Sequence, residues 1–396
     1  MFHDASSSLH NAAQIVFWVS LALVVYAYAL YPIAVWACSR VFGRQPTPPT
    51  DDGGELPLAT LLIAAHDEEA VIRARLENAL ALDYPQEKLE IVVASDGSTD
   101  ATADIVRAFA HRGVRLLEYT PNRGKAATLN AAWREVRGEI VLLSDANTFT
   151  HREAPRHLVR WFRDPAVGAV CGRLVLVDSA TGRNVDGVYW RYETFLKRCE
   201  ARLGALLGAN GAIYAVRRAD YTPLPSGTIV DDFVIPLLAR ARHGSRLVYE
   251  ADAVAREETP AEISEEFKRR ARIGAGGFQS LRMLWPLLSP RHGWLAWSFL
   301  SHKLLRWCCP FFLLALALSD IVLVRSPFYG AALAAQAAFY LAAWLGSRWA
   351  SRSKVARLVR LTTLFTSMNA ALLVGFWRWV TGRQRGVWAR TARTEV

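Results

Sequence analysis

The chain has 396 residues, of which 52% are hydrophobic and 21% charged, with 47 lysines and arginines against 36 aspartates and glutamates. This composition excludes a disordered or collagenous chain, and the length allows about two or three domains. The formal charge of +11 is compatible with nucleic acid, an acidic substrate or a membrane surface. The long apolar segments favour a membrane and phosphate ligands, so no nucleic acid partner is expected.

Long uncharged segments lie at both ends of the chain. No Asp, Glu, Lys or Arg occurs in residues 5–39, 326–347 or 361–377, and a membrane-spanning helix needs ~17–25 mostly apolar residues. We predict a transmembrane anchor within residues 1–40. Residues 292–381 should hold an interfacial helix and three membrane segments, at about 304–324, 328–345 and 361–380, and a basic tail follows at 382–396.

Arginines flank these segments and suggest an orientation. Arg40, Arg44 and the basic stretch 348–360 favour a cytoplasmic location for the middle of the chain. Three full spans after that region would place the basic tail on the opposite side, which conflicts with the positive-inside tendency. Segment 361–380 is therefore either a span or a re-entrant or interfacial segment, and Lys303 and Arg306 are expected to extend their charged ends to the membrane surface.

The sequence predicts a proline-rich linker at 41–57, followed by a soluble domain at 58–291. Short apolar runs alternate there with amphipathic stretches, which is typical of an α/β sheet. The predicted strands are 59–64, 91–94, 114–119, 140–143, 167–171 and 246–250. Ligands of such sheets bind where the carboxyl ends of strands meet loops.

Two of these strands end in acidic motifs. Asp96 follows 91–94 in a Ser-Asp-Gly-Ser-Thr-Asp run, where an oxygen acceptor can bind a base or ribose, although Asp100 can equally form an Asx turn that caps the next helix. Asp145 and Asn147 follow 140–143 and are two residues apart, so they face the same side. A hard divalent cation such as Mg²⁺ takes one or two such ligands and leaves other positions to phosphate oxygens.

Cationic groups and a second acidic pair complete the candidate site. Asn122-Arg123-Gly124-Lys125 is suited to a nucleotide or its phosphates, and Arg269 and Arg272 belong to a cationic cluster that can bind a diphosphate or lipid headgroups. Asp231 and Asp232 precede a helical run. One of them can cap that helix, and a desolvated neighbour with a raised pKa suits a general base.

The five cysteines have no C-x-x-C spacing, and the histidines show no metal-ligand spacing. Trp161 and Phe162 are expected in the core. The sequence therefore predicts neither a disulfide framework nor a cysteine–histidine metal site.

In this order and between membrane segments, the motifs resemble the membrane-bound family 2 glycosyltransferases, which include cellulose, hyaluronan and poly-N-acetylglucosamine synthases. The resemblance covers about 59–281 and implies a glycosyltransferase A-type domain with a mixed, mainly parallel sheet, plus transmembrane helices. The motifs carrying it are the turn with Glu68, the base-binding Asp96, the Gly-Lys segment with Lys125, the metal motif Asp145/Asn147, the acceptor loop with Asn210 and Gly211, and the pair Asp231/Asp232.

Two positions depart from that family. Asn147 stands where a second aspartate is usual. Arg269 and Arg272 fall in the segment that reads Q-x-x-R-W in the polymer-forming members, and Ile273 replaces its tryptophan.

The resemblance implies an inverting hexosyltransferase of the inner membrane, multi-pass, with a cytoplasmic catalytic domain, Mg²⁺ or Mn²⁺ as cofactor and Asp232 as base. The expected donor is a nucleotide sugar, UDP-linked by resemblance, and the acceptor a membrane-associated lipid or glycan in exopolysaccharide or cell-surface glycan synthesis. Other subunits of a glycan synthesis or export complex are among the expected partners. Two alternatives stay open: a single-sugar transferase acting on ceramide, diacylglycerol or a polyprenyl phosphate, and a non-catalytic nucleotide-binding subunit of a synthase.

Overall fold

The computed structural model describes residues 2–49, 54–177, 187–258, 263–346, 348, 354–384 and 386. The chain divides into two compact units. The sheet unit comprises Val35–Glu262 and Gln279–Ser298, and the helical unit comprises the residues up to Ala34 with Ile263–Phe278 and Phe299–Gln384. Part of the predicted linker, 50–53, and nearly all of the predicted basic tail beyond 384 lie outside the described residues.

Eight strands form one sheet in the sheet unit. They are β1 (Ala59–Ala65), β2 (Leu89–Asp96), β3 (Val114–Tyr119), β4 (Ile140–Asp145), β5 (Thr148–Thr150), β6 (Val167–Val177), β7 (Tyr214–Arg217) and β8 (Arg246–Glu258). Their order is β3-β2-β1-β4-β7-β6-β8-β5. The pairs β1–β2, β1–β4, β2–β3 and β6–β8 are parallel, and the pairs β4–β7, β6–β7 and β5–β8 are antiparallel.

This sheet confirms the predicted mixed, mainly parallel α/β fold. All six predicted strands are present. The sequence missed β5 and β7, which are three and four residues long. A strand of that length is too short to show an alternating pattern.

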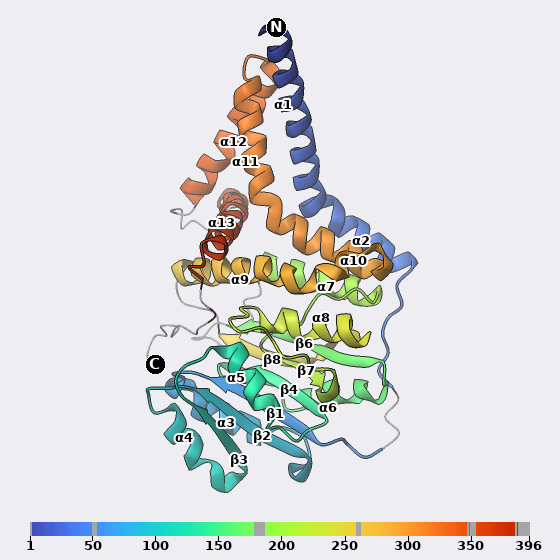
Figure 1. The fold of residues 1–396 in the computed structure, drawn as a ribbon, viewed down its shortest axis with the longest axis vertical. Coiled ribbons are helices and arrows are strands. Elements are labelled where there is room, and N and C mark those ends of the chain that lie inside the picture. The colour runs from blue at the N-terminus through green and yellow to red at the C-terminus, as the bar shows by residue number, and fades with distance from the viewer. Residues whose placement is uncertain are drawn as a thin grey trace. The chain divides into compact units, whose positions relative to one another are not determined.

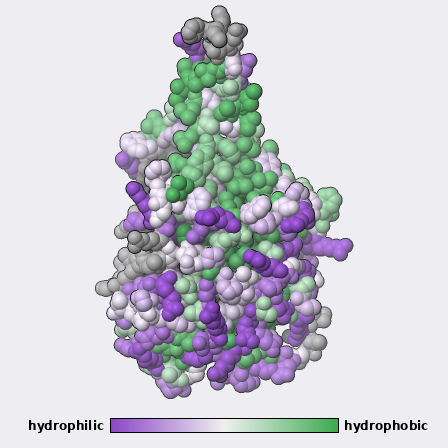
Figure 2. All heavy atoms as spheres, viewed as in Figure 1, coloured by the Kyte–Doolittle hydropathy of each residue, from purple (hydrophilic) through white to green (hydrophobic). Residues whose placement is uncertain are grey.

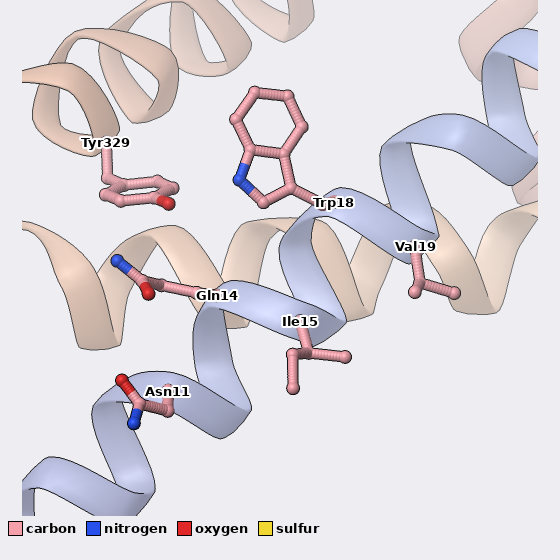
Figure 3. A pocket seen from close by; sticks show the side chains of 6 residues that line it. All are labelled: Asn11, Gln14, Ile15, Trp18, Val19 and Tyr329. Atoms are coloured by element: carbon pink, nitrogen blue, oxygen red, sulfur yellow. The ribbon is translucent and has the colours of Figure 1, made fainter.

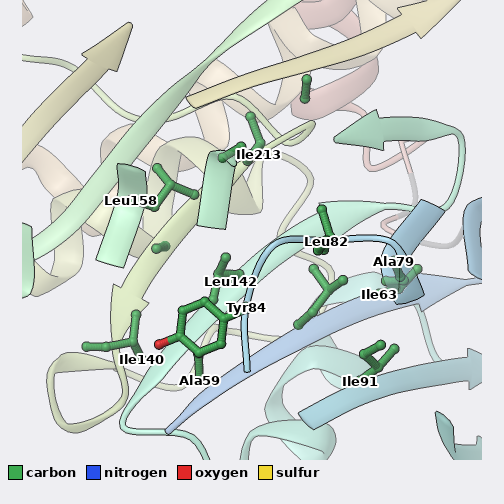
Figure 4. Packing of buried hydrophobic residues seen from close by; sticks show 14 of the residues in the cluster. Ala59, Ile63, Ala79, Leu82, Tyr84, Ile91, Ile140, Leu142, Leu158 and Ile213 are labelled. Carbon is green, nitrogen blue, oxygen red and sulfur yellow. The ribbon is translucent and has the colours of Figure 1, made fainter. Parts of the chain in front are cut away.

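Helices cover the sheet and bury its strands (Figure 1). They are α3 (Glu69–Leu80), α4 (Thr102–Ala108), α5 (Lys125–Trp133), α6 (Ala154–Val159), α7 (Val188–Arg202) and α8 (Asp231–His243). The short α10 (Trp294–Ser298) belongs to the same unit but lies away from the strands. Every residue of β1 is buried, as expected for a central parallel strand covered on both faces. Figure 4 shows Ile63, Ile91 and Leu142 from adjacent strands in this core. Trp161 and Phe162 are also buried, which confirms their expected place.

Short 3₁₀ turns connect several of these elements. They span Gln86–Lys88, Ala110–Arg112, Arg160–Arg163, Arg218–Asp220, Trp285–Leu288 and Pro290–His292. All five cysteines are free thiols.

The helical unit contains most of the apolar surface. Its elements are α1 (Phe2–Val25), η1 (Tyr26–Leu30), η8 (Phe299–Leu304), α11 (Leu305–Leu323), α12 (Pro327–Gly346) and α13 (Lys354–Val380); α2 (Tyr31–Val41) and α9 (Ile263–Leu284) each have residues in both units. Four described stretches are long and apolar enough to cross a membrane: Ser7–Val41, Trp294–Leu323, Pro327–Gly346 and Val359–Val380. Figure 2 shows hydrophobic side chains gathered over this unit. The predicted membrane segments are therefore confirmed as apolar helices.

One of these helices runs in a different direction from the others. In Figure 1, α13 is seen almost along its axis, whereas α1, α11 and α12 run across the view. The hydroxyl of Thr363 on α13 donates to the carbonyl of Ala343 on α12 at 2.9 Å, so the two helices pack together. The unbroken helix 354–380 rules out a re-entrant loop within it.

Arg306 corrects one expectation. Its side chain does not extend to the surface but is 7% exposed, inside the helical unit. It lies over the ring of Tyr28 at 5.6 Å, and the Tyr28 hydroxyl also contacts the amide of Asn369, whose Nδ2 is 3.2 Å away. A buried guanidinium in an apolar helix bundle needs such partners, so these contacts explain why it is tolerated.

A shallow pocket of about 710 Å³ lies on the outside of α1. Figure 3 shows its lining, which comes from Asn11, Gln14, Ile15, Trp18 and Val19 on α1 and from Tyr329 on α12. It contains none of the predicted site residues.

Candidate active site

The loops after β1, β2, β3 and β4 lie at one edge of the sheet. This follows from parallel pairing: Ala64 is opposite Asp145, Ala65 opposite Ser95, and Asp96 opposite Tyr119. The motifs predicted between residues 66 and 147 are thus brought together, as the rule for ligand sites in such sheets requires.

The first two loops are tied to each other. The carboxylate of Asp67 accepts the backbone N–H of Thr99 at 2.7 Å, and the N–H of Asp67 donates to the Ser98 hydroxyl at 3.2 Å. Asp67 has φ of 53°, which is unusual for a residue other than glycine. The next residue, Glu68, donates its N–H to the Thr102 hydroxyl at 2.8 Å and is half-buried at this edge. A role for Glu68 in substrate binding stays a prediction.

Asp100 forms the turn expected of it. Its carboxylate accepts the N–H of Thr102, the first residue of α4, at 2.9 Å. The predicted Asx turn is therefore confirmed, but Asp100 is not the cap of α4, because Ala101 holds the N-cap position and no side chain caps the helix.

Asp96 organises the third loop. It is fully buried, and its two carboxylate oxygens accept the N–H groups of Arg123 at 2.9 Å and Gly124 at 2.8 Å. Gly97 has φ of +65°, and a Cβ there would lie 2.5 Å from the Asn122 nitrogen. The two loops can approach this closely only because residue 97 is glycine. The predicted contact of Asp96 with a nucleotide base stays a prediction beside this structural role.

Lys125 joins two acidic motifs from distant parts of the chain. Its Nζ lies 2.8 Å from Asp145 Oδ1 and 3.1 Å from Asp231 Oδ2. Burial opposes the positive charge, but the carboxylates of Asp145, Asp231 and Asp232 outweigh it and raise the pKa of Lys125. The Lys125 ammonium group, which the sequence predicted to bind substrate, is therefore paired with carboxylates of the protein in this structure.

The aspartate pair divides into a buried and an accessible member. Asp231 has 7% of its side chain exposed, and burial raises its pKa although Lys125 acts against this. Asp232 is half-buried, and its Oδ2 accepts the N–H of Gly211 at 2.9 Å. Helix α8 begins at Asp231 after Val230, with no side-chain cap. The alternative that one aspartate caps this helix is therefore wrong.

Gly211 leaves open a space that the carboxylates of Asp145 and Asp232 both border. A Cβ at this position would lie 2.9 Å from Asp145 Oδ2 and 3.7 Å from Asp232 Oδ2. Its neighbour Asn210 is held by Lys197, which donates to the Asn210 side-chain oxygen, while Asn210 Nδ2 donates to the carbonyl of Gly172 at 3.1 Å. The backbone at 210–211 thus lies against both Asp145 and Asp232.

The Asp145/Asn147 motif is suited to an open cation site. Asp145 has 37% of its side chain exposed, and Asn147 Nδ2 lies 3.4 Å from Glu257 Oε1 on β8. Among the described residues, no three His, Cys, Asp or Glu side chains form a closed metal site. One carboxylate and one amide oxygen, with a second carboxylate nearby, fit a hard cation that keeps positions for water and phosphate.

The two predicted arginines lie on α9 in the helical unit. Arg269 and Arg272 are one helical turn apart and so share a face. Their roles toward phosphate stay predictions.

Sequence reasoning missed three residues of the sheet unit that support this site: Arg75, Lys197 and Glu257. Arg75 carried a signal, because Ile72, Arg75, Leu76 and Ala79 have the i, i+3, i+4, i+7 spacing of a buried helix face, and all four are buried. Lys197 and Glu257 carried none, since their partners are 13 and 110 residues away.

A comparison with protein families matches residues 60–221 to glycosyl transferase family 2. The chain carries a family 2 glycosyltransferase domain. The poly-β-1,6-N-acetyl-D-glucosamine synthase of Staphylococcus aureus is 29% identical over 234 residues, which cover 57% of this chain and 56% of the synthase. The chain thus matches little more than half the length of that relative. A probable glycosyltransferase, YdaM, of Bacillus subtilis is 36% identical over 132 residues, or 32% of this chain and 31% of that protein.

The fold of the family 2 domain and its helices also occurs in a solved structure. A mannosyltransferase from Pyrobaculum calidifontis, determined with GDP-mannose and Mn²⁺, has a TM-score of 0.71 and 24% identity, covering 93% of this chain and 99% of that one. This likeness confirms the predicted glycosyltransferase A-type fold.

We expect Lys125→Met to destabilise the protein by about 3–5 kcal/mol, because it leaves the buried carboxylate of Asp231 without its cation. The pKa of Asp231, which burial already raises, would rise further above its value in the unfolded state because the opposing charge of Lys125 is gone. The folded variant would then bind protons as the pH falls, so its deficit should shrink between about pH 7.5 and pH 5.5. Thermal unfolding of the purified protein at the two pH values measures this.

Lys88→Met is the matched control. Lys88 pairs with Glu55, which is 86% exposed, and surface pairs contribute about 0–1 kcal/mol. The bridging role would be contradicted if Lys125→Met lost no more stability than the control. It would also be contradicted if its loss of stability grew as the pH fell.

Proposed function

We propose that this protein is an inverting glycosyltransferase that moves a hexose from a nucleotide sugar to an acceptor held at the membrane. The observation that carries the proposal is that the Asp145 and Asp232 carboxylates converge on one point: Asp145 Oδ2 and Asp232 Oδ2 lie 2.9 Å and 3.7 Å from the position that a Cβ of Gly211 would occupy. One belongs to the donor-binding edge of the sheet, and the other is available to an acceptor. This arrangement suits a direct transfer between two bound substrates.

In the proposed step, Asp232 takes the proton of an acceptor hydroxyl. The hydroxyl oxygen attacks the anomeric carbon from the face opposite the diphosphate and forms the new glycosidic bond. The bond from that carbon to the diphosphate oxygen breaks, and the nucleoside diphosphate leaves with the electron pair. A single displacement inverts the anomeric configuration.

Asp232 suits the base better than Asp231 for a geometric reason. Asp231 is 7% exposed and its carboxylate lies 3.1 Å from Lys125 Nζ. Asp232 is fixed through Oδ2 by the Gly211 N–H, and among the described residues no hydrogen bond engages its Oδ1. That oxygen remains for a hydroxyl proton, because general-base catalysis requires hydrogen-bond reach.

Asp145 and Asn147 would hold a Mg²⁺ or Mn²⁺ ion, with Glu257 beside them. When bound, such an ion supplies positive charge to the departing diphosphate. Arg272 is proposed as a further cation for the same group, and a uridine nucleotide as the donor's carrier.

The acceptor is proposed to be a growing exopolysaccharide or cell-surface glycan, which the similarity to a poly-N-acetylglucosamine synthase supports. A single transfer to a lipid is the second candidate. Ile273 favours it, since this exposed residue stands where the polymer-forming members have a tryptophan.

We further propose an inner-membrane protein with a cytoplasmic catalytic domain, in which α1, α11 and α12 cross the bilayer and α13 lies along its surface. The direction of α13, across that of the other three helices, supports this arrangement. Three crossings place the sheet unit and the arginine-rich tail on the same side. The conflict with the positive-inside tendency then disappears.

We expect Asp232→Asn to reduce the rate of sugar transfer by about 10²–10⁴-fold, because an amide cannot take the proton of the acceptor hydroxyl. Donor binding should be retained. The measurement is release of nucleoside diphosphate by detergent-purified protein, given a panel of nucleotide sugars with Mg²⁺ or Mn²⁺, together with the size of any glycan formed.

Asp104→Asn is the control for this experiment, since Asp104 is an exposed aspartate on α4. Its activity should equal that of the wild type. An active Asp232→Asn protein would refute the base assignment, and no release from any donor by the wild type would favour the non-catalytic alternative. A single sugar on a lipid would identify a lipid glycosyltransferase, and a ladder of products a polymerase.

The topology yields a separate prediction. A green fluorescent protein fused after Val396 should fluoresce, and an alkaline phosphatase fused there should be inactive, because the tail is expected on the cytoplasmic side. The same reporters fused after Arg325, between α11 and α12, should give the opposite pattern. Periplasmic activity at the Val396 fusion would mean that α13 crosses the membrane.

A further inference from the structure

Arg75 is the largest completely buried side chain of the sheet unit. Its Nη1 donates to the side-chain oxygen of Asn78 at 3.1 Å. Its Nε and Nη2 have no hydrogen-bond partner among the described residues. Buried arginines normally pair with carboxylates, so this one is unexplained by packing alone.

The surroundings of Arg75 lead directly to the donor motif. Asn78 donates to the carbonyl of Thr150 at 2.9 Å and accepts the Thr150 N–H at 2.9 Å. Thr150 ends β5, the strand that begins at Thr148, directly after Asn147. The Arg75–Asn78 pair therefore fixes the strand that follows the Asp145/Asn147 turn.

The charge of Arg75 also acts on this turn. Burial lowers the pKa of Arg75 to about 10, and the negative charge of Asp145 acts against that change. The guanidinium is thus protonated at neutral pH. The neighbouring strand β5, Thr148–Thr150, contains no acidic residue that could neutralise it, and the hydroxyls of Thr148 and Thr150 are likewise buried without partners among the described residues.

We propose that Arg75 is a positioning residue whose fixed positive charge, buried on α3 and linked through Asn78 to the strand that follows the Asp145/Asn147 turn, favours the donor's diphosphate and opposes the metal cation. This inference rests on the proposed function of the site. It accounts for a turn with one carboxylate instead of two, because part of the charge that attracts the diphosphate is built into the protein and does not depend on a metal.

The proposal predicts effects of opposite sign on two ligands. Removing the charge should weaken binding of a nucleoside diphosphate when no metal is present. It should not weaken binding of Mn²⁺ when no nucleotide is present, and should strengthen it, since a nearby positive charge repels the cation. If Arg75 had only a structural role, its substitution would weaken the protein's binding of both ligands.

The test uses the full chain in detergent, with UDP and Mn²⁺ as separate probes. UDP binding is measured by calorimetry in EDTA, and Mn²⁺ binding by the loss of the free-ion signal in electron paramagnetic resonance. For Arg75→Met we expect roughly tenfold weaker UDP binding and Mn²⁺ binding that is equal or tighter. Arg75→Lys, which keeps the charge, should restore most of the UDP affinity. Arg75→Gln serves if the Met variant does not fold.

Arg217→Met is the matched control. Arg217 also donates to backbone carbonyls, those of Phe162, Asp164 and Val167. Its strand partner is Ile140, which lies at the opposite end of β4 from Asp145. This variant should leave the ratio of the two affinities unchanged. Parallel loss of both affinities in Arg75→Met, or no change in either, would overturn the proposal. Failure of the wild type to bind UDP or GDP under any condition would instead refute the proposed function.

Discussion

The double ion pair of Lys125 is the interaction on which the candidate site depends. Its ammonium lies between Asp145, at the end of β4, and Asp231, at the start of α8. These residues are far apart in the chain, and with Asp232 they bring three carboxylates into a small volume. Without a cation, the mutual repulsion and desolvation of those carboxylates would separate the helix from the sheet edge. Lys125 thus allows the proposed donor motif and the proposed base to lie close together.

The position of Lys125 depends in turn on Asp96. Lys125 is the first residue of α5, and the two residues before it donate their N–H groups to the buried Asp96 carboxylate. Asp96 therefore fixes where α5 begins and hence where the ammonium lies. A motif that resembles a base-binding sequence has a second function in the architecture, and the absence of a side chain at Gly97 permits it.

The sequence was sufficient for the parts of the site that follow strands. Asp96 and Asp145 each end an apolar run that predicts a strand. Parallel pairing alone then places the ends of these strands at one edge of the sheet, so no other contact has to be known. The sequence was not sufficient to predict contacts between residues that are distant in the chain, such as Lys125 with Asp231. Such pairs leave no periodic pattern in the sequence. Arg306 shows the same limit: an arginine near a helix end is usually exposed, and only contacts with Tyr28 and Asn369 reveal that this one is buried.

The charge of the donor edge follows from these same contacts. Asp145 is shared with Lys125, Asn147 is neutral, and the buried cation Arg75 lies within the electrostatic reach of Asp145. A turn with two free carboxylates would first attract a metal and bind a diphosphate mainly through it. Here the protein's own cations already offset Asp145, so a metal gains less from binding and a diphosphate is repelled less. Glu257, whose Oε1 lies 3.4 Å from the Asn147 side-chain nitrogen, places a second negative charge beside this turn, so the charge there depends on a carboxylate from β8 as well as on Asp145.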